Sequence, residues 1–220
     1  MNDQTRYDPG EELANSVTHS AGLLLAIAGL VFMLDRAIEY GDIWHRVSSA
    51  VFGLSLIILY ASSALYHGIR NASIKSRLQL LDHSAIYVLI AGSYTPFMLV
   101  NLRGPWGWSM LAVVWSLAIA GIVFEFKPGP PRKRVTVGLS VAMGWCVVVV
   151  AGPMLRSVDS NGLWLLLLGG LFYTAGIAFY LWRSLRHHHA IWHLFVLAGS
   201  AAHYFAVLFF VIPFQSPHHG

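Results

Sequence analysis

Apolar residues are grouped along the chain into seven stretches with few or no charged residues, separated by short polar linkers. Each stretch is close to the roughly 20 residues that an α-helix needs to cross the hydrocarbon core of a bilayer. The pattern therefore predicts an all-α, polytopic membrane protein, a seven-transmembrane helix bundle. The predicted spans are approximately Val17–Leu34, Val47–Tyr66, Ser84–Val100, Trp106–Phe126, Val135–Leu155, Leu163–Trp182 and Ile191–Ile212.

The polar ends of the chain flank a single predicted domain. We expect residues 17–212 to form the seven-transmembrane domain, residues 1–16 a cytoplasmic N-terminal segment, and residues 213–220 a disordered C-terminal end. The N-terminal segment is net acidic and lacks the basic region of a cleavable signal peptide. We therefore expect the first span to be retained in a multi-pass protein of the cell (inner) membrane.

Composition excludes a soluble globular protein. Hydrophobic residues make up 56% of the chain and charged residues only 11%, whereas soluble domains have about 25% charged residues. The net charge of +4 is no indication of a nucleic-acid partner, because the basic residues lie between the spans. The single cysteine, Cys146, excludes an intramolecular disulfide and a cysteine-based zinc motif.

Lys and Arg are distributed unevenly between the two sides of the predicted bundle. Most lie in the N-terminal segment and in the second, fourth and sixth linkers: Arg6, Arg70, Lys75, Arg77, Lys127, Arg132, Lys133, Arg134, Arg183 and Arg186. The other side carries Arg36, Arg46, Arg103 and Arg156. The positive-inside rule predicts that the N-terminus is cytoplasmic.

Three histidines are predicted to meet at the cytoplasmic end of the spans. His189 and His193 are four residues apart at the start of the seventh span, so a helix places both imidazoles on one face. His67 closes the second span on the same side. Three neutral imidazoles with an open fourth position are typical of zinc, and a site without several carboxylates disfavours calcium and magnesium. The sequence predicts a Zn²⁺ site formed by these three residues.

A carboxylate and a hydroxyl accompany the predicted zinc site. Asp82 lies near the start of the third span, and Ser63 precedes His67 by one helical turn. We expect Asp82 to contact the water ligand of the metal and to act as general base, while Ser63 orients a ligand or stabilises an oxyanion. Two simpler interpretations remain. Asp82 could instead pair with Arg77 or Lys75, and each histidine could be an ordinary interfacial polar residue.

These residues also carry a family resemblance. Five segments, taken in order along nearly the whole chain, resemble the bacterial hemolysin III branch of the progestin and adipoQ receptor family, whose wider superfamily includes alkaline ceramidases. The segments are Glu12–His19, Ser63–His67, Leu81–Tyr87, Gly92–Phe97 and His189–His193. The resemblance implies a seven-helix fold, a cytoplasmic N-terminus and a zinc ion near the inner leaflet. It assigns the ligand role to His67, His189 and His193, the water-contacting role to Asp82 and a supporting role to Ser63.

Other polar residues are less clearly assigned. Glu12, Asn15 and His19 match a family motif without revealing its chemistry, although His19 could be a further polar group around the metal pocket. We expect His187 and His188 to lie in a solvated loop. The chain lacks the long N-terminal extension of the eukaryotic receptors, which disfavours a hormone receptor.

Three functions are open at this point. The first is a zinc-dependent intramembrane hydrolase acting on a lipid-like amide or ester. Its expected partners are membrane lipids, and its expected role is in membrane lipid or energy homeostasis. The second is a non-enzymatic membrane sensor or a pore-forming haemolysin in which zinc is structural. The third, a transporter, is disfavoured because polar residues are absent deep in the fourth to sixth spans.

Overall fold

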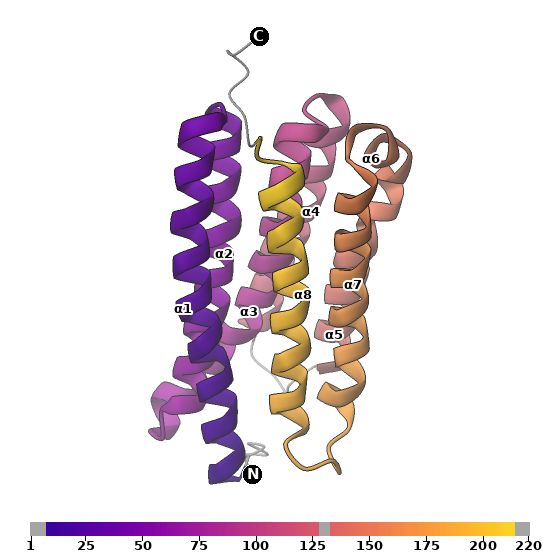
Figure 1. Ribbon diagram of the computed structural model, residues 1–220. Coiled ribbons are helices and arrows are strands. Elements are labelled where there is room, and N and C mark those ends of the chain that lie inside the picture. The colour runs from indigo at the N-terminus through magenta and orange to yellow at the C-terminus, as the bar shows by residue number, and fades with distance from the viewer. Residues whose placement is uncertain (1–7, 128–132, 214–220) are drawn as a thin grey trace.

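The computed structural model describes residues 8–127 and 133–213, and seven helices in these ranges are long and apolar enough to cross a membrane. Figure 1 shows them side by side with the start of the first helix and the start of the last helix at one end. The elements are α1 (Pro9–Tyr40), α2 (Ile43–Gly68), α3 (Ala72–Pro96) continued by the π-helix η1 (Phe97–Asn101), α4 (Pro105–Glu125), α5 (Lys133–Trp145) continued by the 3₁₀-helix η2 (Cys146–Val150) and by α6 (Ala151–Ser157), α7 (Ser160–Leu181) and α8 (His188–Phe210). The predicted all-α, seven-span fold is confirmed.

Two helices begin well before the start that the hydropathy pattern predicts. Helix α1 starts at Pro9, where a proline in the first turn and the acidic Glu11 and Glu12 favour a helix start. Helix α3 starts at Ala72, because the Asn71 side chain accepts hydrogen bonds from two backbone N–H groups of its first turn. The polar first turns of these helices therefore extend past the apolar spans.

The start of α8 corrects one prediction. His188 is helical and buried, so the expectation of a solvated loop is wrong for this residue. Its Nδ1 lies 3.1 Å from the carbonyl oxygen of Phe179 on α7, which anchors the beginning of α8 to the preceding helix.

Parts of the predicted organisation fall outside the described residues. Residues 1–7 and 214–220 belong to the predicted N-terminal segment and C-terminal end, and Arg132 of the basic fourth linker lies in the undescribed range 128–132. The cytoplasmic placement of the N-terminus stays a prediction from the positive-inside rule.

The fifth span is broken, and Tyr94 of α3 lies at the break. Val147 donates its backbone N–H to the Tyr94 hydroxyl oxygen at 2.8 Å. The same hydroxyl lies 2.8 Å from the carbonyl oxygens of Met143 and Gly144. In a membrane interior every backbone polar group needs a partner within the protein. The Tyr94 hydroxyl thus provides hydrogen-bond partners for backbone groups at the junction of α5 and η2.

Helices α2, α3 and α8 form the most buried part of the bundle, whereas the fifth span (α5, η2 and α6) and α7 expose most of their apolar side chains. Leu155 and Trp164, for example, are 71% and 67% exposed, as expected for a lipid-facing surface. Small residues allow the central helices to approach closely. A Cβ atom at Gly92 of α3 would overlap the Ser55 side chain of α2. The tight α2–α3 packing fixes the relative depth of the residues near their connected ends.

Candidate metal centre

Three buried imidazoles meet at the end of the bundle where α2 ends and α8 begins. His67 comes from the last turn of α2, and His189 and His193 come from the first two turns of α8; their exposed fractions are 3%, 6% and 1%. The ring centroids are 4.6–5.2 Å apart. One ring nitrogen from each residue lies within 4.8 Å of the other two, which allows the three side chains to share one metal ion. The structure therefore brings the predicted ligands together.

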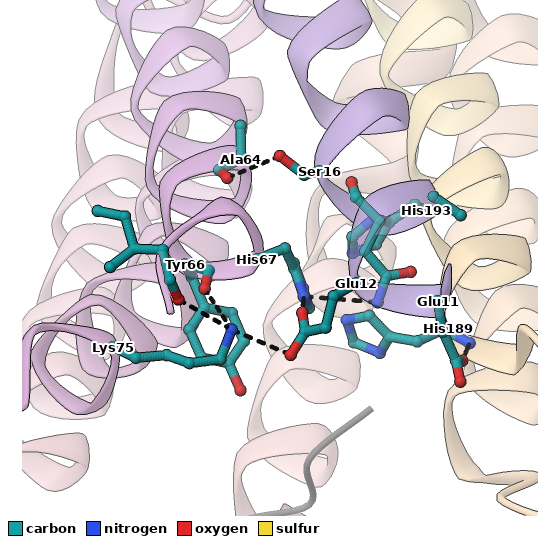
Figure 2. Close-up of polar contacts among 12 residues, drawn as sticks. Glu11, Glu12, Ser16, Ala64, Tyr66, His67, Lys75, His189 and His193 are labelled. Carbon is teal, nitrogen blue, oxygen red and sulfur yellow. Dashed lines mark hydrogen bonds and ion pairs between the residues drawn. The ribbon is translucent and has the colours of Figure 1, made fainter. Parts of the chain in front are cut away.

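Glu12 of α1 orients His67. Its Oε2 lies 2.7 Å from Nδ1 of His67, and its Oε1 lies 3.0 Å from Nζ of Lys75 (Figure 2). Because a carboxylate only accepts hydrogen bonds, Nδ1 of His67 is the protonated nitrogen and Nε2 carries the lone pair. A metal-binding histidine typically donates its second ring N–H to such an acceptor.

Lys75 in turn is held by the end of α2. Its ammonium group donates to the carbonyl oxygen of Tyr66 at 2.7 Å and lies 4.7 Å from the centre of the Tyr66 ring. Glu12 is thus fixed from two directions, by the imidazole of His67 and by an anchored cation. This arrangement joins the starts of α1 and α3 to the end of α2.

The backbone of α1 orients His193. Nδ1 of His193 lies 3.2 Å from the carbonyl oxygen of Asn15 and 3.3 Å from the hydroxyl of Thr18. The hydroxyl of Thr18 already donates to backbone carbonyls of its own helix, so it acts as an acceptor toward the imidazole. Both neighbours therefore favour a proton on Nδ1 of His193, which leaves Nε2 able to bind a metal ion.

Glu11 caps the helix that carries two of the imidazoles. The residue before α8, His187, has a left-handed backbone (φ 56°) and provides no side-chain cap. Instead, the backbone N–H of His189 donates to Oε1 of Glu11 at 3.3 Å (Figure 2). A carboxylate at a helix N-terminus also interacts favourably with the helix dipole. The first helix therefore stabilises the start of the last one.

His19 packs against one of the three imidazoles, that of His193. Its ring is stacked on that of His193, with centroids 3.5 Å apart and an angle of 14° between the planes, and Tyr60 meets its edge. His19 is 3% exposed, and neither of its ring nitrogens has a hydrogen-bond partner among the described residues. The structure thus places His19 beside the predicted metal pocket.

Asp82 and Ser63 lie on the facing sides of α3 and α2. Both are buried, and the carboxylate of Asp82 is within electrostatic range of Ser63 and His67. Lys75, one of the alternative partners predicted for Asp82, pairs with Glu12 instead. The catalytic roles of Asp82 and Ser63 remain predictions.

The donor set fits a transition-metal ion such as zinc. Three imidazoles converge, and two of them have their second nitrogen engaged by an acceptor, as is usual for histidine ligands. The residues that sequence reasoning left without a role, Glu12 and Asn15, provide these acceptors. The motif shared with the family marked both positions, but only the packing of α1 against α2 and α8 reveals what they do.

Comparison with known proteins agrees with this geometry. The sequence model described as "Haemolysin-III related" matches residues 7–204, almost the whole described bundle. The chain belongs to the haemolysin III-related family. Two similar members of this family are the "Hemolysin-3 homolog" of Bacillus subtilis (strain 168), 46% identical over 94% of this chain and 98% of the relative, and the "Hemolysin-3" of Bacillus cereus, 43% identical over 94% of both chains.

The similarity extends to animals. The human "Monocyte to macrophage differentiation factor" is 31% identical over 92% of this chain and 86% of its own length. The resemblance to the hemolysin III branch of the progestin and adipoQ receptor family is confirmed. With its seven membrane-spanning helices, this haemolysin III-related chain is a multi-pass protein of the cell membrane.

Proposed function

We propose that this protein is a zinc-dependent hydrolase that acts within the membrane on a lipid-like amide or ester. The observation that supports this proposal is the convergence of three buried imidazoles beside a buried carboxylate. His67, His189 and His193 would hold the metal. In such a site, zinc polarises a carbonyl group and makes water reactive near neutral pH.

The remaining chemistry falls to the protein's own side chains. Asp82 is the nearby carboxylate that can take a proton from the attacking water and return it to the leaving group. Ser63, which faces Asp82, can donate a hydrogen bond to the negative charge that develops on the substrate oxygen. Glu12 and the carbonyl of Asn15 keep His67 and His193 in the orientation that the metal requires.

The location of the site indicates the class of substrate. The imidazoles are enclosed by helices whose outer surfaces are apolar: Leu13, Leu65 and Leu194 are all more than half exposed near this end of the bundle. A substrate with an acyl chain can remain in the bilayer while its polar group reaches the imidazoles. With the N-terminus in the cytoplasm, as the positive-inside rule predicts, the site would serve the inner leaflet and a role in membrane lipid homeostasis.

Metal analysis of the purified protein tests the metal site. Wild type is expected to retain zinc, while His67→Ala, His189→Ala and His193→Ala lose it. His45→Ala is the control, because His45 lies in the first turn of α2, at the end of that helix opposite to His67. Retention of zinc by all three variants would overturn the assignment.

Turnover is tested separately with Asp82→Asn. Purified protein is given a fluorogenic N-acyl lipid amide and the matching ester. We expect Asp82→Asn to lose hydrolysis while its zinc content stays at the wild-type level, and the exposed Asp35→Asn to behave as wild type. Hydrolysis by Asp82→Asn at the wild-type rate would contradict the proposed role of this carboxylate.

A second function is suggested by the relatives' names. Two bacterial relatives are called Hemolysin-3, which suggests a membrane-permeabilising protein in which the metal only joins helices. Leakage of dye from liposomes containing the purified protein, unchanged after zinc is removed, would favour this alternative. Hydrolysis without leakage would favour the enzyme.

A further inference from the structure

A pocket of about 790 Å³ with both polar and apolar lining residues lies at the end of the bundle that holds the imidazoles, between the start of α1, the end of α2 and the start of α3. Polar side chains in its wall include Ser16, His67, Lys75, Ser76 and Gln79. His67 therefore forms part of the pocket wall, although its own side chain has no exposed surface. The pocket therefore borders the metal centre at His67, whereas His189 and His193 do not line it.

The pair of Glu12 and Lys75 lies between this pocket and the imidazoles. Both residues line the pocket, and their side chains are only 17% and 18% exposed. Figure 2 shows the Glu12 carboxylate between Lys75 on one side and His67 on the other. The pair connects α1 to α3, two of the three helices that border the pocket.

Polar side chains distinguish this route from the lipid-facing sides of the bundle, although the charges of Asp8 and Glu12 are balanced by those of Arg70 and Lys75. A hydrated divalent ion cannot cross the apolar surfaces around the site, where Leu65 and Leu194 are more than half exposed. The pocket instead offers hydroxyl, amide and carboxylate oxygens. Carboxylate oxygen and imidazole nitrogen are both zinc ligands, so Glu12 can bind the ion on its way to His67.

We propose that this pocket is the entrance through which a divalent metal ion reaches His67, His189 and His193, and that the Glu12–Lys75 ion pair closes it. The inference rests on the metal site proposed above. It assigns to Lys75 a role in the rate of metal exchange, distinct from the affinity that the imidazoles determine.

Blocking the pocket with a thiol reagent tests the route directly. In a Cys146→Ser background, Ser76→Cys places the only thiol in the pocket wall, and Ser73→Cys places it on the same helix outside the pocket; both positions are exposed. Each zinc-loaded variant is treated with a bulky charged methanethiosulfonate. Zinc release to an excess of a chromogenic chelator is then followed with time.

We expect modification at position 76 to slow zinc release about tenfold or more, which corresponds to an increase of about 1.4 kcal/mol in the activation free energy of release. Reduction of the mixed disulfide should restore the original rate. Modification at position 73 should leave the rate unchanged. Equal release rates for the two modified variants would overturn the proposed entrance.

Lys75→Met provides an independent measurement. This substitution removes the Glu12–Lys75 ion pair but leaves the hydrogen bond between Glu12 and His67 in place. Zinc binding and zinc release should therefore both accelerate several-fold, with little change in the equilibrium constant for zinc binding. Exchange rates equal to wild type would count against a closing role.

The two proposals fail in different ways. A purified protein that binds no zinc at the imidazoles refutes both the metal site and the entrance. Zinc that binds at the imidazoles but exchanges equally fast with the pocket blocked refutes only the entrance. Loss of lipid hydrolysis alone affects neither result, because the release measurement needs no substrate.

Discussion

The carboxylate of Glu12 lies 2.7 Å from Nδ1 of His67, although the two residues are 55 positions apart in the chain. This contact joins the first two spans at the depth of the metal centre. It also determines which nitrogen of His67 faces the other imidazoles, because the carboxylate accepts the Nδ1 proton. Glu12 is therefore a positioning residue for the proposed metal site.

Truncation of Glu12 should weaken metal binding. Loss of the acceptor that orients a histidine ligand typically reduces affinity about 10- to 100-fold, and we expect Glu12→Ala to fall in this range. Glu12→Gln should lose less, because its amide oxygen can still accept the Nδ1 proton. Competition with a zinc chelator measures the affinities. Glu39→Ala, on the same helix at its other end, is the control; an equal affinity for the Glu12 and Glu39 variants would contradict this role.

Replacement of His19 should stabilise the protein. Two buried ring nitrogens without hydrogen-bond partners among the described residues cost folding free energy, and leucine has a similar volume without polar atoms. We expect His19→Leu to raise the unfolding free energy by about 1 kcal/mol or more. Tryptophan fluorescence during heating in detergent provides the measurement.

The comparison for this prediction is His45→Leu. His45 hydrogen-bonds Asp42 through Nδ1 at 2.7 Å, so this substitution should destabilise the protein. If His19→Leu lowers the unfolding temperature as much as His45→Leu does, the nitrogens of His19 have partners in solution and the prediction is wrong.

The sequence predicted which three imidazoles come together but not the groups that orient them. His67 ends an apolar span, and His189 and His193 begin another with helical spacing, so span counting alone brought them to one side of the membrane. The contacts of Glu12 and Asn15 depend on α1 lying against both α2 and α8. Hydropathy does not encode which helices are neighbours, and Glu12 resembled part of a polar N-terminal segment.

Removal of the Tyr94 hydroxyl should destabilise the fifth span. In Tyr94→Phe, the N–H of Val147 loses its acceptor in an apolar environment, which costs about 1–3 kcal/mol. Tyr204→Phe is the matched control, because its hydroxyl makes a single, longer hydrogen bond of 3.2 Å to the carbonyl oxygen of Gly29. Thermal unfolding should show the larger loss for Tyr94→Phe, and equal losses would contradict the structural role of Tyr94.

Sequence reasoning missed the break that Tyr94 accommodates. The apolar run from Val135 to Leu155 has the length of one continuous span, and hydropathy does not distinguish α-helix from 3₁₀-helix. The change in helix type at Cys146 places Val147 beside the Tyr94 hydroxyl. A hydrogen bond between two spans cannot be read from either span alone.

The cap of α2 should make stability depend on pH. Partial desolvation acts to raise the pKa of Asp42, but hydrogen bonds from His45 and Trp44 outweigh it and hold the pKa below the ordinary value of 3.8. A carboxylate with a lowered pKa contributes stability above its ordinary pKa, and this contribution is lost as the pH falls through the folded-state value.

Asp42→Asn tests this dependence. Asparagine is an equally good N-cap but does not titrate. Unfolding temperatures measured from about pH 6 to about pH 3 should fall more steeply for wild type than for the variant once the pH is below about 4. Parallel curves would show that the Asp42 carboxylate makes no such contribution.

The bond between Glu11 and the backbone of His189 has a consequence for biosynthesis. The first span leaves the ribosome long before the last one is made, so Glu11 lacks this partner until synthesis has passed position 189. A chain that stops after six spans lacks two of the three imidazoles of the proposed metal site, His189 and His193. If the proposed site holds zinc, its capture would report that translation and assembly of the whole bundle are finished.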